Sequence, residues 1–122
     1  MRDTGYGPVA IKLRSTGEII GSGGFYQTEV PDEAEIFYGF ARHAWGQGYA
    51  TEAGRTLITA GMHQLRLATI VAPIHPDNVR SIRVVEKLGM TFSHVTTTYT
   101  LYEVAHLYQL KRPSATVQPM TL

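Results

Sequence analysis

Apolar and polar residues alternate over the first third of the chain, which is typical of β-strands. Strands are predicted at 9–13, 18–27 and 33–42. The turn residues at 15–17 should join the first two strands as an antiparallel hairpin. Glycines inside the second strand weaken it, and they indicate either a bulge or the close approach of another segment.

The apolar period then changes from two residues to about 3.6, which predicts helices. One helical face runs from Ala50 to about residue 66, and a short buried-type strand follows at 68–74. A second helix is predicted at 79–88. Asn78 is suited to cap its first turn, and Gly89 is suited to end it.

Two β-rich segments at 91–98 and 103–111 predict a final hairpin, and 112–122 is expected to be a flexible tail. The strand–helix–strand unit in the middle implies one parallel strand pair, whereas the hairpins are antiparallel. The predicted fold is α+β of the three-layer type, with a mixed, mostly antiparallel sheet, a central parallel pair and flanking helices. A single domain should span 1–122.

Composition supports an ordinary globular domain. The chain has 122 residues and a mass of 13.5 kDa, so it can bury roughly two-thirds of its unfolded surface. Eleven basic and ten acidic residues leave a net charge of +1, which gives no electrostatic footprint for nucleic acid. Arginines outnumber lysines by eight to three, and arginine suits bidentate contacts with phosphate or carboxylate groups.

Several classes of site are excluded by what the sequence lacks. There is no cysteine, which excludes disulfides, thiolate zinc sites and a cysteine nucleophile. The apolar stretch at 67–74 is too short to span a bilayer. We therefore expect a cytoplasmic protein without a membrane or nucleic-acid partner. Four of the histidines show no metal-ligand spacing, so no metal is expected.

The strongest candidate for chemistry is the glycine loop between the third strand and the first helix. Backbone N–H groups and the helix dipole at such a junction form an anion site suited to a pyrophosphate. The alternative is a plain turn in which the glycines only supply unusual dihedral angles. The residues of the loop and the first helical turn are Trp45, Gly46, Gln47, Gly48, Tyr49, Ala50 and Thr51.

The stretch WGQGYATEA, followed after a strand by NVRSIRVVEKLGM, resembles the GNAT acyl-CoA-dependent N-acetyltransferases. Within them it looks most like the RimJ/RimL group, which acetylates protein N-terminal amines. The family's pyrophosphate motif, Gln/Arg-x-x-Gly-x-Gly/Ala, matches Trp45 to Ala50, with tryptophan at its first position. The resemblance covers about 8–111. It implies acetyl-CoA as cofactor, an amine acceptor and a homodimer, in a chain that lacks the N-terminal strand and helices of the group.

The resemblance also implies where the cofactor arm lies. In the family it follows the edge of the third strand where that strand splays from its neighbour, and backbone N–H groups there polarise the thioester carbonyl. Here that edge comprises Phe40, Ala41 and Arg42. Simple core packing of Phe40 and Ala41 is the alternative, and both interpretations can hold together.

Asn78 and Ser81 share one face of the second helix. The resemblance implies that Asn78 contacts the cofactor arm and that Ser81 donates a proton to the thiolate; the alternative is that Asn78 only caps the helix. Many GNAT proteins carry a tyrosine acid where this chain has Val85, which shifts the hypothesis to Ser81. Tyr49 and Tyr102 are substitutes.

Two residues are candidates for the general base. Glu35 matches the strand position of the glutamate in histone-type GNAT acetyltransferases, although it is equally consistent with a half-exposed glutamate paired with an arginine. His75 has an intrinsic pKa suited to the task, but a histidine beside a proline turn is more often structural. The competing hypotheses are a CoA-binding or oligomerising module without catalysis, and acetylation of a small amine such as a polyamine or antibiotic.

Overall fold

The structure is a computed structural model that describes residues 6–97, 104–113 and 122. Six strands and two α-helices follow the predicted order, so the arrangement of elements inferred from the sequence is confirmed. The elements are β1 (Gly7–Lys12), β2 (Ile19–Gln27), β3 (Glu33–Phe40), η1 (Arg42–Ala44), α1 (Tyr49–His63), β4 (Thr69–Ile74), α2 (Val79–Lys87), β5 (Thr91–Thr96) and β6 (Ala105–Lys111).

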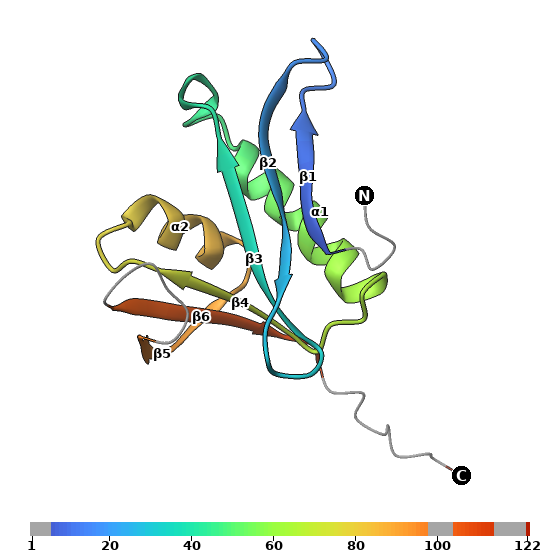
Figure 1. Cartoon of the computed structure of the whole chain (residues 1–122), viewed down its shortest axis with the longest axis vertical. Coiled ribbons are helices and arrows are strands. Elements are labelled where there is room, and N and C mark those ends of the chain that lie inside the picture. The colour runs from blue at the N-terminus through green and yellow to red at the C-terminus, as the bar shows by residue number, and fades with distance from the viewer. Residues whose placement is uncertain (1–5, 98–103, 114–121) are drawn as a thin grey trace.

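The strands form one mixed sheet in the order β1-β2-β3-β4-β6-β5. The predicted hairpins β1–β2 and β5–β6 are antiparallel, and β3–β4 is the parallel pair. Only residues 33–35 of β3 pair with 69–71 of β4. Beyond Glu35 the two strands diverge, and Figure 1 shows them opening into a V. Past this point β3 continues to Phe40 and β4 to Ile74 without pairing to each other, and we call this divergence the splay.

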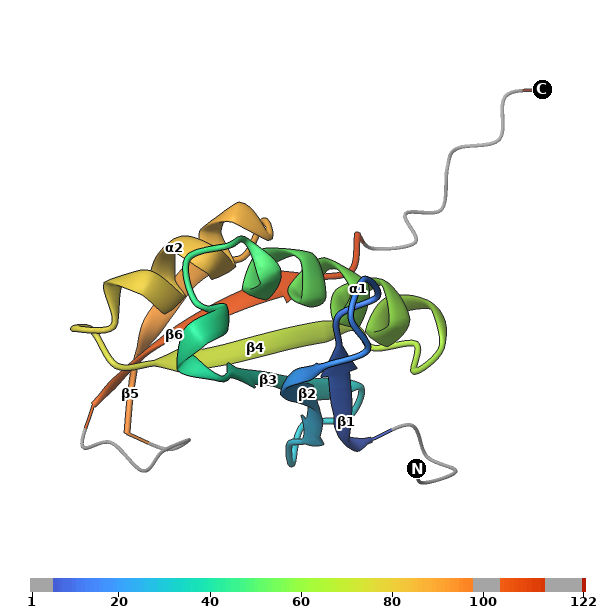
Figure 2. The ribbon, with the colours of Figure 1, turned by 90° about the horizontal axis from the view of Figure 1, so that it is seen from above.

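Both α-helices lie on one face of the sheet (Figure 2). Alternation along β3 directs Ala34 and Ile36 toward them, with 0% and 4% of these residues exposed. The predicted mixed sheet with flanking helices is confirmed, and the described residues arrange it as two layers. The opposite face carries Glu35 and Phe37, and no described helix covers it. No helix among the described residues is long and apolar enough to cross a membrane.

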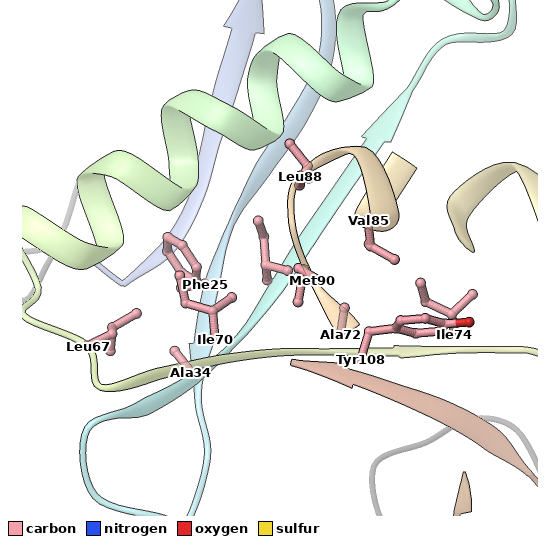
Figure 3. Packing of buried hydrophobic residues seen from close by; sticks show 11 residues of the cluster. Phe25, Ala34, Leu67, Ile70, Ala72, Ile74, Val85, Leu88, Met90 and Tyr108 are labelled. Carbon is pink, nitrogen blue, oxygen red and sulfur yellow. The ribbon is translucent and has the colours of Figure 1, made fainter. Parts of the chain in front are cut away.

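The core lies between this sheet face and the helices (Figure 3). Apolar side chains from the central strands meet side chains of α2 and the segment after it. Its buried members are Phe25, Ala34, Ile36, Leu67, Ile70, Ala72, Ile74, Val85, Leu88, Met90 and Tyr108. The glycine-rich pattern of β2 is explained in part by helix packing, since a Cβ on Gly23 would lie 3.1 Å from Cδ1 of Leu57 in α1.

The C-terminal end of α1 differs from the prediction. The helix ends at His63, whereas the apolar periodicity extends to about residue 66. Arg66 adopts a positive φ of 55°, which turns the chain so that Leu67 enters the core with none of its surface exposed. The apolar residues keep helical spacing as far as Leu65. The helix nevertheless ends at His63, because Leu67 can pack against the sheet only if the chain turns away from the helix axis before it.

The segment expected to be a tail begins with an ordered contact. The N–H of Arg112 donates to the carbonyl oxygen of Ala68 at 2.7 Å, and its Nε donates to that of Leu67 at 3.1 Å. The Arg112 guanidinium also bonds to the carbonyl oxygen of Met62. Arg112 thus joins the end of β6 to the turn after α1. Residues 114–121 lie outside the described part of the chain.

Leu67→Ala should lower the free energy of unfolding by about 2–5 kcal/mol, because it leaves a cavity where a fully buried leucine packs. Urea unfolding followed by circular dichroism measures this change. Ile19→Ala is the matched control, since Ile19 is 64% exposed and its truncation should change stability by less than about 0.5 kcal/mol. Equal losses in both variants would contradict the assignment of Leu67 to the core.

Candidate active site

The glycine loop joins β3 to α1 through the short turn η1. Gly46 and Gly48 have φ values of 77° and 82°, a conformation that side-chain-bearing residues rarely adopt. Gly48 is the N-cap of α1, Ala50 and Thr51 lie in its first turn, and no side chain of the described residues caps the helix. A Cβ placed on Gly46 or Gly48 would meet no atom within 4 Å. The loop therefore offers uncapped N–H groups and open space at the positive end of α1.

Trp45 connects this loop to the strand before it and to α2. Its Nε1 donates to the carbonyl oxygen of Phe40 at 2.9 Å. The guanidinium carbons of Arg42 and Arg80 lie over the indole, 5.4 and 4.7 Å from the ring centroid. Gln47 adds a hydrogen bond from Nε2 to the carbonyl oxygen of His43 at 3.1 Å. Because Arg80 belongs to α2, its side chain links the first turn of α2 to the residue before the glycine loop.

The backbone of β3 presents alternating N–H groups to its two neighbours. The N–H of Ala41 donates to the carbonyl oxygen of Ile20 at 2.8 Å, on the side of β2. Because bonds in an antiparallel ladder alternate along the strand, the N–H groups of Tyr38 and Phe40 face the splay. Phe40 therefore presents an N–H to a ligand in the splay, whereas the N–H of Ala41 is already bonded. Burial raises the pKa of Tyr38 to about 12, so its hydroxyl stays protonated at neutral pH.

Asn78 and Ser81 lie where β4 leads into α2. The Asn78 side-chain oxygen accepts a hydrogen bond from the backbone N–H of Ser81 at 3.2 Å, so Asn78 does cap the helix. In the described part of the chain, no hydrogen bond to the Asn78 amide N–H groups or to the Ser81 hydroxyl is found. Val85 is one turn beyond Ser81 on the same face and is buried in the core. Ser81 therefore points from α2 toward the sheet.

Glu35 lies where the splay begins. Its side chain is on the sheet face opposite the helices, and partial burial raises its carboxyl pKa. Tyr26 of β2 pairs directly across from it. The Tyr26 ring stacks on Phe37 with centroids 4.2 Å apart. Glu35 is therefore a carboxylate of increased basicity beside an aromatic pair. The arginine partner considered for it is not found among the described residues.

Glu35→Gln should stabilise the fold at neutral pH. Burial raises the pKa of the Glu35 carboxyl, so ionising it is less favourable in the folded chain than in the unfolded one. At a pH below the pKa of Glu35 in the unfolded chain, the carboxyl is neutral in both the folded and the unfolded chain, and its burial has no ionisation cost. The cost develops as the pH rises from the pKa of the unfolded chain to the higher pKa of the folded chain. The variant should therefore have a higher thermal midpoint than the wild type at pH 7 and the same midpoint in acid. A lower midpoint at pH 7 would contradict this.

His75 is held in the turn between β4 and α2. Its Nδ1 accepts a hydrogen bond from the backbone N–H of Asp77 at 3.0 Å, and the same nitrogen lies 3.8 Å from Asp77 Oδ2. These contacts favour the structural interpretation of His75, because they use a ring nitrogen to shape the turn.

The tertiary structure brings together the glycine loop, the end of β3 and the first turn of α2. The contact of Arg80 with Trp45 was not predicted from the sequence, although Arg80 is part of the motif NVRSIRVVEKLGM. Tyr49 is half-buried at the first position of α1, and Tyr102 lies outside the described residues. A hollow of about 370 Å³ lined by Met62, Leu110 and Arg112 lies at the opposite end of α1 and does not overlap this site.

Comparison with known proteins shows the family to which this chain belongs. The model of the acetyltransferase (GNAT) domain matches residues 1–91. An uncharacterised N-acetyltransferase of Bacillus licheniformis, p20, is 38% identical over 81 residues, which cover 66% of this chain and 46% of that protein. The chain spans about half the length of the curated relatives it matches.

Solved structures share the fold. An acetyltransferase from Agrobacterium tumefaciens is 28% identical with a TM-score of 0.73, over 88% of this chain and 62% of that one. An aminoglycoside acetyltransferase solved with coenzyme A and kanamycin is 24% identical with a TM-score of 0.74, over 86% and 66% of the two chains. At that identity the second likeness shows the fold alone. With the family model matching most of its length, the chain belongs to the GNAT acetyltransferase family.

Proposed function

We propose that this protein transfers an acetyl group from acetyl-CoA to a primary amine. The observation that carries the proposal is the contact of Arg80 with Trp45, 4.7 Å from its ring centroid, which joins the first turn of α2 to the glycine loop beside the splay. The open space at Gly46 and Gly48 fits a pyrophosphate approaching the backbone closely. The divergence of β3 from β4 after Glu35 fits an extended pantetheine arm.

The residues divide the chemistry of a direct transfer among them. The N–H groups at the splay hold the thioester carbonyl oxygen as negative charge develops on it. Glu35 accepts a proton from the attacking amine, and Ser81 donates one to the departing thiolate. A carbon–nitrogen bond forms as the carbon–sulfur bond breaks. The proton balance closes when Glu35 releases its proton to solvent and Ser81 regains one.

The acceptor approaches from the sheet face that carries Glu35. The other face of the sheet is packed against α1 and α2 by the core, whereas no helix among the described residues lies on the face with Tyr26 and Phe37. A single carboxylate as base favours an α-amine with a pKa of about 8 over a lysine with a pKa of about 10.4. At pH 7, deprotonation costs about 1 kcal/mol for the α-amine and nearly 5 kcal/mol for lysine.

This preference supports the RimJ/RimL-like interpretation, in which the acceptor is a protein or peptide N-terminal amine. A small amine is the second candidate, favoured by the same fold in an enzyme solved with kanamycin. A binding module without catalysis is the third candidate. Homodimeric assembly and cytoplasmic location stay predictions.

Incubation with acetyl-CoA and a panel of amines tests the proposal. The panel should contain peptides with free N-terminal amines, N-terminally blocked peptides with a lysine, spermidine and kanamycin. Mass spectrometry should detect one added acetyl group, most rapidly on the free N-terminal amines. Preference for lysine, spermidine or kanamycin would contradict the proposed acceptor. Binding of acetyl-CoA without turnover of any amine would favour the module.

A further inference from the structure

Two arginines from different elements lie over one indole ring. Arg42 follows β3, Arg80 is in the first turn of α2, and their guanidinium carbons lie 5.4 and 4.7 Å from the Trp45 centroid. Trp45 is itself anchored by its bond to the carbonyl oxygen of Phe40. This arginine–tryptophan cluster, made of Arg42, Trp45 and Arg80, therefore joins two segments that are far apart in the sequence.

The two guanidinium groups have no acidic partner in the part of the chain that the structure describes. Among the described residues, Glu18 contacts His43 at 3.0 Å, and the backbone N–H of Asp77 donates to His75 Nδ1. Both arginines and nearly half of the surface of the tryptophan are exposed. A guanidinium held over an indole keeps its N–H groups for hydrogen bonds in its own plane, a geometry that suits a phosphate.

We infer that this arginine–tryptophan cluster binds a phosphate monoester, separately from the pyrophosphate held by the glycine loop. The inference rests on the proposed function, because coenzyme A carries both groups and its monoester is the 3′-phosphate. The loop N–H groups at the start of α1 are suited to one anion, and the two arginines add two positive charges to the same region. Charge complementarity therefore favours a second, doubly charged phosphate.

The test compares the binding of coenzyme A and 3′-dephospho-coenzyme A, which differ only in that phosphate. Trp45 is the only tryptophan of the chain, so its fluorescence reports binding at the cluster without any catalytic assay. The wild-type protein should bind coenzyme A about tenfold more tightly, and added salt should reduce the difference. In Arg80→Gln and Arg42→Gln the ratio of the two affinities should fall from about ten toward one.

Lys111→Gln is the matched control for the loss of one positive charge. Lys111 lies near the end of β3 that is remote from the cluster, because it pairs with Thr69 of β4 and Thr69 pairs with Glu33, the first residue of β3. This variant should therefore keep the full preference for coenzyme A. Arg80→Lys should keep part of it, because the charge remains and the planar N–H geometry is lost. Thermal unfolding of each variant verifies that the fold is retained.

Each other outcome has a definite meaning. Equal affinity of the wild-type protein for the two ligands would overturn the inference and leave the proposed function intact. If Arg80→Gln lost the same factor of affinity for both ligands, Arg80 would only hold α2 against the loop. That result would also overturn the inference. Binding of neither ligand by the wild-type protein would remove the proposed function and the inference with it.

Discussion

Glu35→Gln should slow acetyl transfer by about 100-fold or more, within the range for loss of a general base. The amide keeps the size and polarity of the side chain but cannot accept a proton from the amine. Glu35 lies at the apex of the splay, on the sheet face that carries no described helix, which is why we propose it for this role. Initial rates at saturating acetyl-CoA measure the effect.

Glu33→Gln is the matched control. Glu33 lies two residues earlier on the same sheet face and accepts a hydrogen bond from the Thr28 hydroxyl at 2.8 Å. Its replacement should leave the rate within about twofold of the wild type, in line with a carboxylate that contacts no reacting group. A Glu35→Gln enzyme that is as fast as Glu33→Gln would exclude Glu35 as the base.

Ser81→Ala should slow single-turnover acetyl transfer by about 100-fold, because the departing thiolate loses its proton donor. The helix cap survives in this variant, since Asn78 accepts a hydrogen bond from the backbone N–H of residue 81 and not from its hydroxyl. Stability should change by less than about 0.5 kcal/mol, so a loss of rate can be assigned to chemistry.

Ser93→Ala is the control for removal of a serine hydroxyl. Ser93 is in β5, where its hydroxyl bonds to His94 at 2.8 Å, and its replacement should leave the rate unchanged. A wild-type single-turnover rate in Ser81→Ala would remove Ser81 from the mechanism. In that case Tyr49, half-buried at the start of α1, is the next residue to replace.

The elements most accurately predicted from sequence are those encoded by local patterns. Alternation and turn residues predicted both hairpins, and Asn78 and Gly89 marked the ends of α2 as the structure has them. The end of α1 was not predictable in this way, because the apolar pattern continues past the last helical residue. Where the chain leaves the helix depends on the position of the sheet, which receives Leu67.

The candidate site shows the same division. The glycine turn before α1 and the Asn78 cap of α2 each lie within a few neighbouring residues, so their geometry could be predicted from residue type and spacing. The contact of Arg80 with Trp45, and the direction of the N–H of Ala41 toward β2, depend on segments far apart in the chain. No local pattern encodes such contacts.

The sequence alone therefore determined the order of the elements, the parallel pair and the glycine turn that begins α1, because each follows from short-range periodicity and backbone preference. Only the tertiary structure decided where β3 and β4 part, which sheet face α1 and α2 cover, and that two arginines lie over Trp45. These features arise from strand register and helix packing, which depend on the whole core and not on neighbours in the chain.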